Sequence, residues 1–298
     1  MRQYIVCGLQ LCGSLFALFL TTRKLVWLTV YTAISKLSIF TLLGVFFLYN
    51  ISQIISAVRS LYYLNAIGIY LNHSQNIALY YLGMFYNTFL PGTVGGDGYK
   101  IFMLKKHSSQ KTLQLIQVLL LDRLNGFLGL LLIAIFFLPK FSQFEQWLRP
   151  WLLFCFIAVF SSIFSVLQYY FIKLSWRAWW HTIFLSVLSQ GLQVAAALWI
   201  AFSCDHSVSF CLFAFVFILS TIFSQLPISL GGMGARELTA VYFLQWLGLD
   251  ATTGLLMGSI FFLIQTISNS IGIFFMSLDL SQEYISPSVN NSCLYQEK

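Results

Sequence analysis

The stretch P-G-T-V-G-G-D-G-Y-K at residues 91–100 has a near copy, P-I-S-L-G-G-M-G-A-R, at residues 227–236. Both read P-x-x-x-G-G-x-G-x-(K/R), and the second proline follows the first by 136 residues. Proline removes a backbone donor, and glycine allows backbone conformations that other residues avoid. Each stretch ends an apolar run, so the pattern predicts two helices that are interrupted at matched positions.

The composition indicates that these interruptions lie in a membrane protein. Hydrophobic residues make up 59% of the 298 residues and charged residues 8%, whereas charged residues approach about a quarter of an average soluble domain. This balance predicts an all-α integral membrane protein that crosses the cell membrane (inner or plasma membrane) several times. The net charge of +7 suits the anionic face of a membrane. Because the basic residues are scattered along the chain, they do not favour nucleic-acid binding.

Apolar segments near the length needed to cross a bilayer, about 20 residues, predict about six full transmembrane helices. They cover residues 4–21, 38–57, 113–138, 150–172, 181–203 and 252–277. No small-residue cleavage site follows the first segment, so we expect it to remain as an uncleaved span. Residues 1–278 are expected to form one membrane domain, followed by a polar, disordered tail at 279–298.

Two further apolar segments, residues 76–90 and 209–226, are short and run into the interruptions. We interpret them as re-entrant broken-helix segments in an inverted repeat, an arrangement in which transporters place a site near the membrane midplane. With a cytoplasmic N-terminus, nine basic residues would then lie on the cytoplasmic side and five on the opposite side. If the broken segments cross fully instead, the loops change sides and this count no longer holds.

If a helix restarts after each interruption, its first turn is expected to form an anion site. Its first N–H groups have no partner within the helix and its dipole end is positive, which attracts anions, especially with a cation in the first turn. The predicted substrate-binding residues are therefore Lys100 and Arg236, together with the paired glycines Gly95, Gly96, Gly231 and Gly232. The alternative is that the glycines only allow close helix packing. Two matched copies favour the site.

Charged residues inside the predicted 113–138 span form a second candidate group. Ionisable groups at that depth are costly and mark a pathway or a buried pair. Asp122 and Arg123 are adjacent and project about 100° apart, so we expect each to find a different partner. Arg123, assigned to substrate binding, would meet Asp97, Glu237 or an anionic headgroup; alternatively both charges extend to the membrane surface.

The acidic residues Asp97, Asp122 and Glu237 are predicted to gate the site or to couple charge movement to transport. Asp97 has an alternative role as an ordinary helix cap. Four amides on the later spans are expected mainly to join helices rather than to contact substrate. They are Gln190, Gln193, Gln265 and Asn269.

The cysteines and histidines do not point to a metal. The six cysteines form no C-x-x-C pair, the four histidines are isolated, and no H-E-x-x-H is present. We therefore predict no metal, no cofactor and no catalytic residue, and we regard enzymatic activity as the less favoured alternative.

Taken together, these residues resemble the membrane domain of lysylphosphatidylglycerol synthases. The resemblance rests on Arg59, the run 87–97, the pair Asp122-Arg123 and the run 227–237, and it extends from about residue 5 to residue 278. That flippase-like domain is associated with moving lipids between leaflets, and relatives occur near envelope glycolipid and polysaccharide pathways. Lys100 stands where the family frequently has arginine, which keeps the charge and loses the bidentate fork. No soluble aminoacyl-transfer domain follows, so the resemblance implies a stand-alone member and not lysine transfer.

These observations lead us to expect translocation of an anionic lipid or a lipid-linked envelope intermediate, with its headgroup between the two P-x-x-x-G-G segments. The expected partners are an anionic phospholipid or lipid-linked glycan, the membrane itself, and an envelope-biosynthesis enzyme or a second copy of the chain. A membrane-embedded transferase is one alternative, although the nine acidic residues include no D-D or D-x-D pair. A non-catalytic subunit of an envelope-synthesis enzyme is the other.

Overall fold

The computed structural model describes residues 37–89, 95–137, 150–205, 209–225, 234–249 and 251–276. Across these ranges the regular structure consists of nine α-helices and one short 3₁₀ helix, without a strand. The helices are α3 (Ile39–Ala66), α4 (His73–Phe89), α5 (Gly95–His107), α6 (Thr112–Phe137), α7 (Pro150–Ile172), α8 (Trp176–Cys204), α9 (Phe210–Ser224), α10 (Ala235–Trp246), α11 (Thr252–Ser270) and η2 (Ile271–Phe275). The all-α architecture predicted from the sequence is confirmed.

Five of the described helices are long and apolar enough to cross a membrane. They are Ile39–Ala66, Thr112–Phe137, Phe154–Ile172, Trp176–Cys204 and Thr252–Phe275, the last combining α11 with η2. These correspond to five of the six predicted spans and confirm a multi-pass membrane protein. The first predicted span, residues 4–21, and the predicted disordered tail lie outside the described residues.

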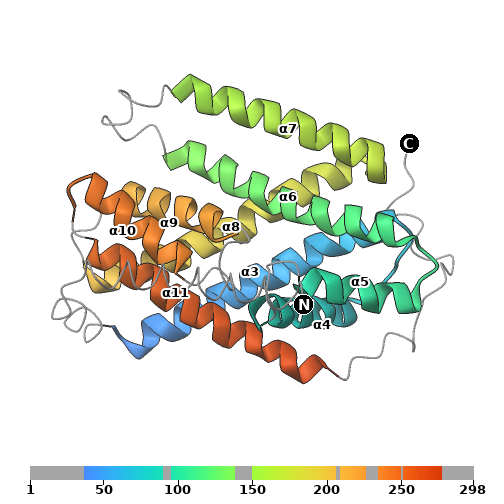
Figure 1. The fold of residues 1–298 in the computed structure, drawn as a ribbon, viewed down its shortest axis with the longest axis horizontal. Helices are drawn as coiled ribbons and strands as arrows, with labels where there is room; N and C mark the ends of the chain where they lie inside the picture. The colour runs from blue at the N-terminus through green and yellow to red at the C-terminus, as the bar shows by residue number, and fades with distance from the viewer. Residues whose placement is uncertain are drawn as a thin grey trace, which may run out of the picture.

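The shorter helices pack in two pairs, α4 with α5 and α9 with α10. Figure 1 shows these two pairs toward opposite ends of the bundle, with the long helices running between the ends. The residues that join the members of each pair, 90–94 and 226–233, lie outside the described residues. Re-entry from opposite faces of the membrane therefore stays a prediction that this arrangement favours.

The helix order α3–α4–α5–α6 recurs as α8–α9–α10–α11. Each helix of the second set begins 137 to 140 residues after its counterpart, close to the spacing of the two proline–glycine stretches. The two sets interlock, because α3 packs along α8, α6 contacts α8 and α9, and α11 contacts α3 and α4. Helix α7 lies outside this arrangement and packs on α6 (Figure 1).

Local chemistry explains where the long helices start and which faces they bury. The hydroxyl of Ser38 accepts from the N–H of Phe40 at the start of α3, and the hydroxyl of Ser175 accepts from the N–H of Ala178 at the start of α8. Large apolar side chains such as Phe40 and Phe274 remain more than three-quarters exposed. Such exposure suits a helix face that contacts lipid.

Candidate functional site

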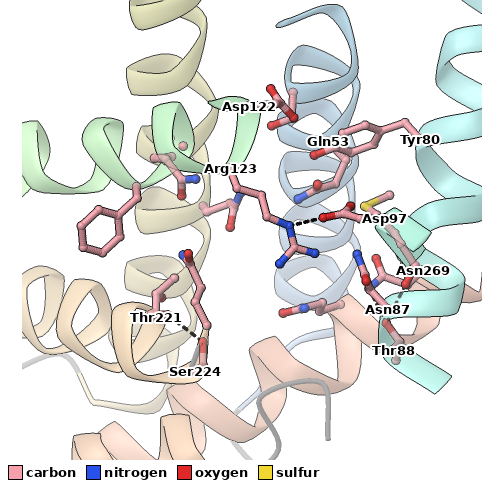
Figure 2. Close-up of a pocket in the computed structure, with 18 of the residues that line it drawn as sticks. Gln53, Tyr80, Asn87, Thr88, Asp97, Asp122, Arg123, Thr221, Ser224 and Asn269 are labelled. Atoms are coloured by element: carbon pink, nitrogen blue, oxygen red, sulfur yellow. Dashed lines mark hydrogen bonds and ion pairs between the residues drawn. The ribbon is translucent and has the colours of Figure 1, made fainter. Parts of the chain in front are cut away.

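A cavity of about 270 Å³ lies between the two sets of helices. Its walls come from α3, α4, α5, α6, α8, α9, α10 and α11, so each helix of both sets contributes at least one residue. The ends of α4 and α9 and the first turns of α5 and α10 meet at this cavity, with Asn87, Asp97 and Ser224 around it (Figure 2). The cavity therefore lies where both interrupted segments change from one helix to the next.

The two matched cations, Lys100 and Arg236, both line this cavity. They are buried, with 7% and 6% of their surfaces exposed. The ammonium of Lys100 lies 4.1 Å from the centre of the Tyr80 ring. The guanidinium of Arg236 lies 5.0 Å from the centre of the Phe261 ring and donates to the side-chain oxygen of Gln265 at 3.2 Å.

Neither of these two cations forms an ion pair with a described carboxylate. A buried charge is expensive to desolvate, and a countercharge normally offsets that cost. Aromatic faces and amide oxygens offset part of it at Lys100 and Arg236. Both side chains thus line the cavity as buried cations that form no ion pair with a carboxylate of the described residues.

Arg123 extends from α6 across the cavity and forms an ion pair with Asp97 at the start of α5 (Figure 2). The side chain of Arg123 is 38% exposed and that of Asp97 is 13% exposed. The side-chain oxygen of Asn87 accepts from the N–H of Gly96 at 2.8 Å, so Asn87 supplies a cap to α5. The carboxylate of Asp97 is directed to Arg123 instead.

Asp122, the neighbour of Arg123, accepts from Nε of Arg59 at 2.7 Å, and both side chains are less than a tenth exposed. Arg59 also donates to Ser186 on α8 at 2.8 Å, and the hydroxyl of Ser186 donates to Asn125 at 3.0 Å. This closed network joins α3, α6 and α8. Asp122 and Arg123 take separate partners, as the 100° rotation between adjacent helical residues predicts.

The remaining predicted residues lie beside the cavity or outside the described residues. The carboxylate of Glu237 accepts from the N–H of Gly234 at 2.9 Å, which closes the first turn of α10. Gly234 itself has a φ of 82°, a conformation that favours glycine. A Cβ on Gly96 would overlap the carbonyl oxygen of Gly83, so this glycine holds α5 against α4. Neither Glu237, Gly95 nor Gly96 lines the cavity, and Gly231 and Gly232 lie outside the described residues.

Amide side chains form a large part of the cavity wall. From the sequence, those on the later spans were expected mainly to join helices. Seven amides line the described cavity: Gln53, Asn87, Gln190, Gln193, Gln225, Gln265 and Asn269. Some do join helices, since Asn269 accepts from Tyr49 at 3.1 Å and donates to Thr88 at 2.8 Å. The signal that could have identified them is the recurrence of single amides within apolar segments, as at Asn87 and Gln225 just before the two prolines.

Three buried polar atoms of the cavity wall have no hydrogen-bond partner among the described residues. They are Nε of Arg236, the hydroxyl of Thr221 and the side-chain oxygen of Gln190. Buried polar groups are normally paired.

The helical bundle and its charged internal cavity define a multi-pass membrane protein with a polar site at the junction of two repeated units. The chain belongs to the family described as the lysylphosphatidylglycerol synthase TM region, which it matches over residues 5–174. The match includes the first proline–glycine stretch and ends before α8, and family membership associates the chain with a function that involves membrane lipids. A search of curated proteins found no match.

Proposed function

We propose that this protein moves an anionic lipid, or a lipid-linked envelope intermediate, between the leaflets of the membrane. The observation that carries the proposal is the pair of buried cations, Lys100 and Arg236, which line one cavity without a described carboxylate partner. An anionic headgroup would supply the negative countercharge for these two cations. Its acyl or prenyl chains would remain in the surrounding lipid.

The charge of the cavity wall supports an anionic ligand. Four cations line the cavity, Arg59, Lys100, Arg123 and Arg236, against the two carboxylates of Asp97 and Asp122. The described wall therefore has an excess of two positive charges, and both carboxylates are already engaged by arginines. A phosphate, with its several acceptor oxygens, suits such a set of donors.

The repeated helices offer a route for transport. In many transporters, two related units rock around a fixed site near the midplane. Here each unit would expose the cavity to one leaflet in turn, with Lys100 in the first unit and Arg236 in the second. In this scheme Asp97 and Asp122 hold Arg123 and Arg59 in place, and Glu237 stabilises the first turn from which Arg236 projects.

A leaflet-resolved assay in proteoliposomes tests the proposal. Purified protein is reconstituted with a trace of acyl-labelled anionic phospholipid, and a membrane-impermeant quencher reports the label left in the inner leaflet. We expect the protein to accelerate exchange, and Lys100→Gln or Arg236→Gln to slow it about tenfold or more, because each removes a charge-assisted hydrogen bond. Lys106→Gln removes an exposed cation outside the cavity and should leave the rate unchanged.

Two results would contradict the proposal. The first is that the unaltered protein does not raise the leaflet-exchange rate of any anionic lipid above the rate in protein-free vesicles. The second is that the double variant, Lys100→Gln with Arg236→Gln, retains the full rate while remaining folded and monodisperse.

A further inference from the structure

We propose that Tyr63 is a positioning residue of the candidate site, and that it holds the guanidinium of Arg59 at the cavity wall from outside the cavity. Arg59 lines the cavity, whereas Tyr63 does not. The inference rests on the proposed function, because it concerns how one cation of the wall is held in place for the headgroup. It is carried by an unbroken series of buried hydrogen bonds that leads from Tyr63 to Arg59.

The series of hydrogen bonds crosses three helices. The phenol oxygen of Tyr63 on α3 accepts from the side-chain amide of Asn125 on α6 at 2.5 Å. The side-chain oxygen of Asn125 accepts from the hydroxyl of Ser186 on α8 at 3.0 Å. That hydroxyl in turn accepts from Nη1 of Arg59 at 2.8 Å, while Nε of Arg59 donates to Asp122 at 2.7 Å. Each side chain therefore fixes the next one, and the series ends on the guanidinium.

Burial leaves no solvent to replace a lost partner in this series. Tyr63, Asn125 and Ser186 are fully buried, and Arg59 is 4% exposed. A polar group in such surroundings interacts more strongly than in water, and leaving it unsatisfied is costly. A broken bond is therefore relieved by movement of the neighbouring side chains, and that movement passes along the series to Arg59.

Helical spacing explains how α3 and α6 contribute two members each. Arg59 and Tyr63 are four residues apart on α3, and Asp122 and Asn125 are three apart on α6, so each pair shares one helix face. A Cβ on Gly126, which lines the cavity, would lie 3.3 Å from Nη1 and 3.6 Å from Nη2 of Arg59. The guanidinium thus stands beside the cavity wall, and the phenol lies about one helical turn behind it.

The orientation of a guanidinium matters because its hydrogen bonds to an anion are directional. Arginine binds phosphate with a planar fork of N–H groups, often through two parallel bonds. Supports that fix the side chain before the ligand arrives reduce the ordering cost of binding. Asp122 fixes the fork at Nε, and the series from Tyr63 fixes it at Nη1. Tyr63 therefore acts on the site through Arg59 and without touching the ligand.

Tyr63 has a second hydrogen bond, outside this series, which provides a matched control. The side-chain amide of Gln168 on α7 donates to the same phenol oxygen. Gln168 is 1% exposed and does not line the cavity, and α7 lies outside the repeated set of helices. Gln168 therefore joins α7 to α3 without belonging to the series that leads to Arg59.

The experiment compares two substitutions that remove different bonds of the phenol. Tyr63→Phe removes the acceptor of both Asn125 and Gln168, whereas Gln168→Leu removes only the bond to α7. In proteoliposomes with acyl-labelled phosphatidylglycerol, we expect Tyr63→Phe to slow leaflet exchange about 2- to 10-fold, the effect of one hydrogen bond. Gln168→Leu should leave the exchange rate unchanged, although both variants should unfold at a lower temperature than the unaltered protein.

A spectroscopic measurement follows Arg59 itself and does not depend on transport. In protein with isotopically labelled arginine, the NMR signal of Arg59 Nε is assigned by its loss in the double variant Arg59→Met with Asp122→Leu. We expect Tyr63→Phe to shift this signal and Gln168→Leu to leave it in place. If Tyr63→Phe does not fold, Ser186→Ala replaces it with the same expectations, because it removes the last member before Arg59 with a small change in volume.

A shifted Arg59 signal and slower exchange in Tyr63→Phe, with neither change in Gln168→Leu, support the inference. An unshifted signal in Tyr63→Phe, or an unchanged exchange rate, would overturn it. Equal slowing by the two substitutions would also overturn it, because Tyr63 would then act through the attachment of α7. A signal that shifts only in Tyr63→Phe, in a protein that exchanges no anionic lipid even when unaltered, would overturn the proposed function and leave the positioning of Arg59 by Tyr63 standing.

Discussion

At the residue scale, the two ion pairs of the cavity differ in burial and therefore in what they do. The Arg59–Asp122 pair is less than a tenth exposed and belongs to a network across three helices. The Arg123–Asp97 pair is more open, with Arg123 at 38% exposure. Removing one member of a buried pair leaves the other charge buried without a countercharge, which is strongly destabilising. An exposed pair contributes little to the free energy of unfolding.

We predict that Asp122→Asn destabilises the protein by about 3–5 kcal/mol, because it leaves the buried guanidinium of Arg59 without a countercharge. The free energy of unfolding in mixed detergent–SDS micelles measures this. The double variant Arg59→Met with Asp122→Leu replaces both charges with apolar groups and should recover most of the loss. A loss below about 1 kcal/mol in the single variant would show that Arg59 finds compensation elsewhere.

Asp97→Asn should behave differently, since it removes the carboxylate that pairs with Arg123. We expect a change in the free energy of unfolding of about 1 kcal/mol or less, because Arg123 is more than a third exposed. Binding of an anionic phospholipid, measured by native mass spectrometry, should become several-fold tighter as Arg123 turns to the headgroup. Weaker binding with intact stability would assign the carboxylate itself to ligand contact.

At the element scale, close backbone contact holds α4 and α5 together and positions Lys100. Gly96 packs against the backbone of Gly83, and the side chain of Lys100 passes over Gly83, where a Cβ would collide with it. Gly96 of the first stretch thus contributes to the packing of α5 on α4. The sequence left packing and ligand binding as alternatives for these glycines, and the position of Gly96 favours packing for that residue.

The chain supplies a matched pair of substitutions for this contact. Gly96→Ala forces α5 away from α4 and should cost about 1–3 kcal/mol and slow lipid exchange by displacing Lys100. Gly98→Ala, two residues further, meets no heavy atom within 4 Å and should be neutral or stabilise α5 by up to about 1 kcal/mol. Thermal unfolding and the exchange assay compare the two. Equal effects of the two substitutions on stability and exchange would show that the contact between Gly96 and Gly83 does not hold α5 against α4.

At the scale of the whole molecule, exposed positive charge gathers at one end of the bundle. Among the described residues, the exposed cations lie at the α5–α6 and α7–α8 turns: Lys105, Lys106, Lys111, Lys173 and Arg177. Figure 1 shows these turns at the same end, away from α9 and α10. Cytoplasmic loops are rich in lysine and arginine, so we predict that this end faces the cytoplasm.

Cysteine labelling tests this orientation and the re-entrant arrangement together. In a cysteine-free background, Ser74→Cys and Lys106→Cys flank the α4–α5 pair, and Ser209→Cys and Gln245→Cys flank α9–α10. Re-entry predicts that an impermeant thiol reagent reaches the first two only from the cytoplasm and the last two only from outside. Reaction of Ser74→Cys and Lys106→Cys from opposite sides would mean that the first pair crosses the membrane fully.

The sequence by itself determined the class of protein, five of the spans and the repeated cations. These follow from local properties, because the length and hydrophobicity of a segment decide whether it can cross a bilayer. The matched spacing of Lys100 and Arg236 was visible for the same reason, since both stretches repeat one short pattern.

Only the tertiary structure decided which charges meet and which amides surround them. Arg59 and Asp122 are 63 residues apart in the chain and Tyr49 and Asn269 are 220 residues apart, so no local pattern reveals that they touch. The sequence predicted either a helix cap or a site residue at Asp97, and it could not show that Asn87 accepts from the N–H of Gly96 while Asp97 pairs with Arg123. Partner choice inside a membrane is set by how helices cross, and those crossings come from the packing of the whole bundle.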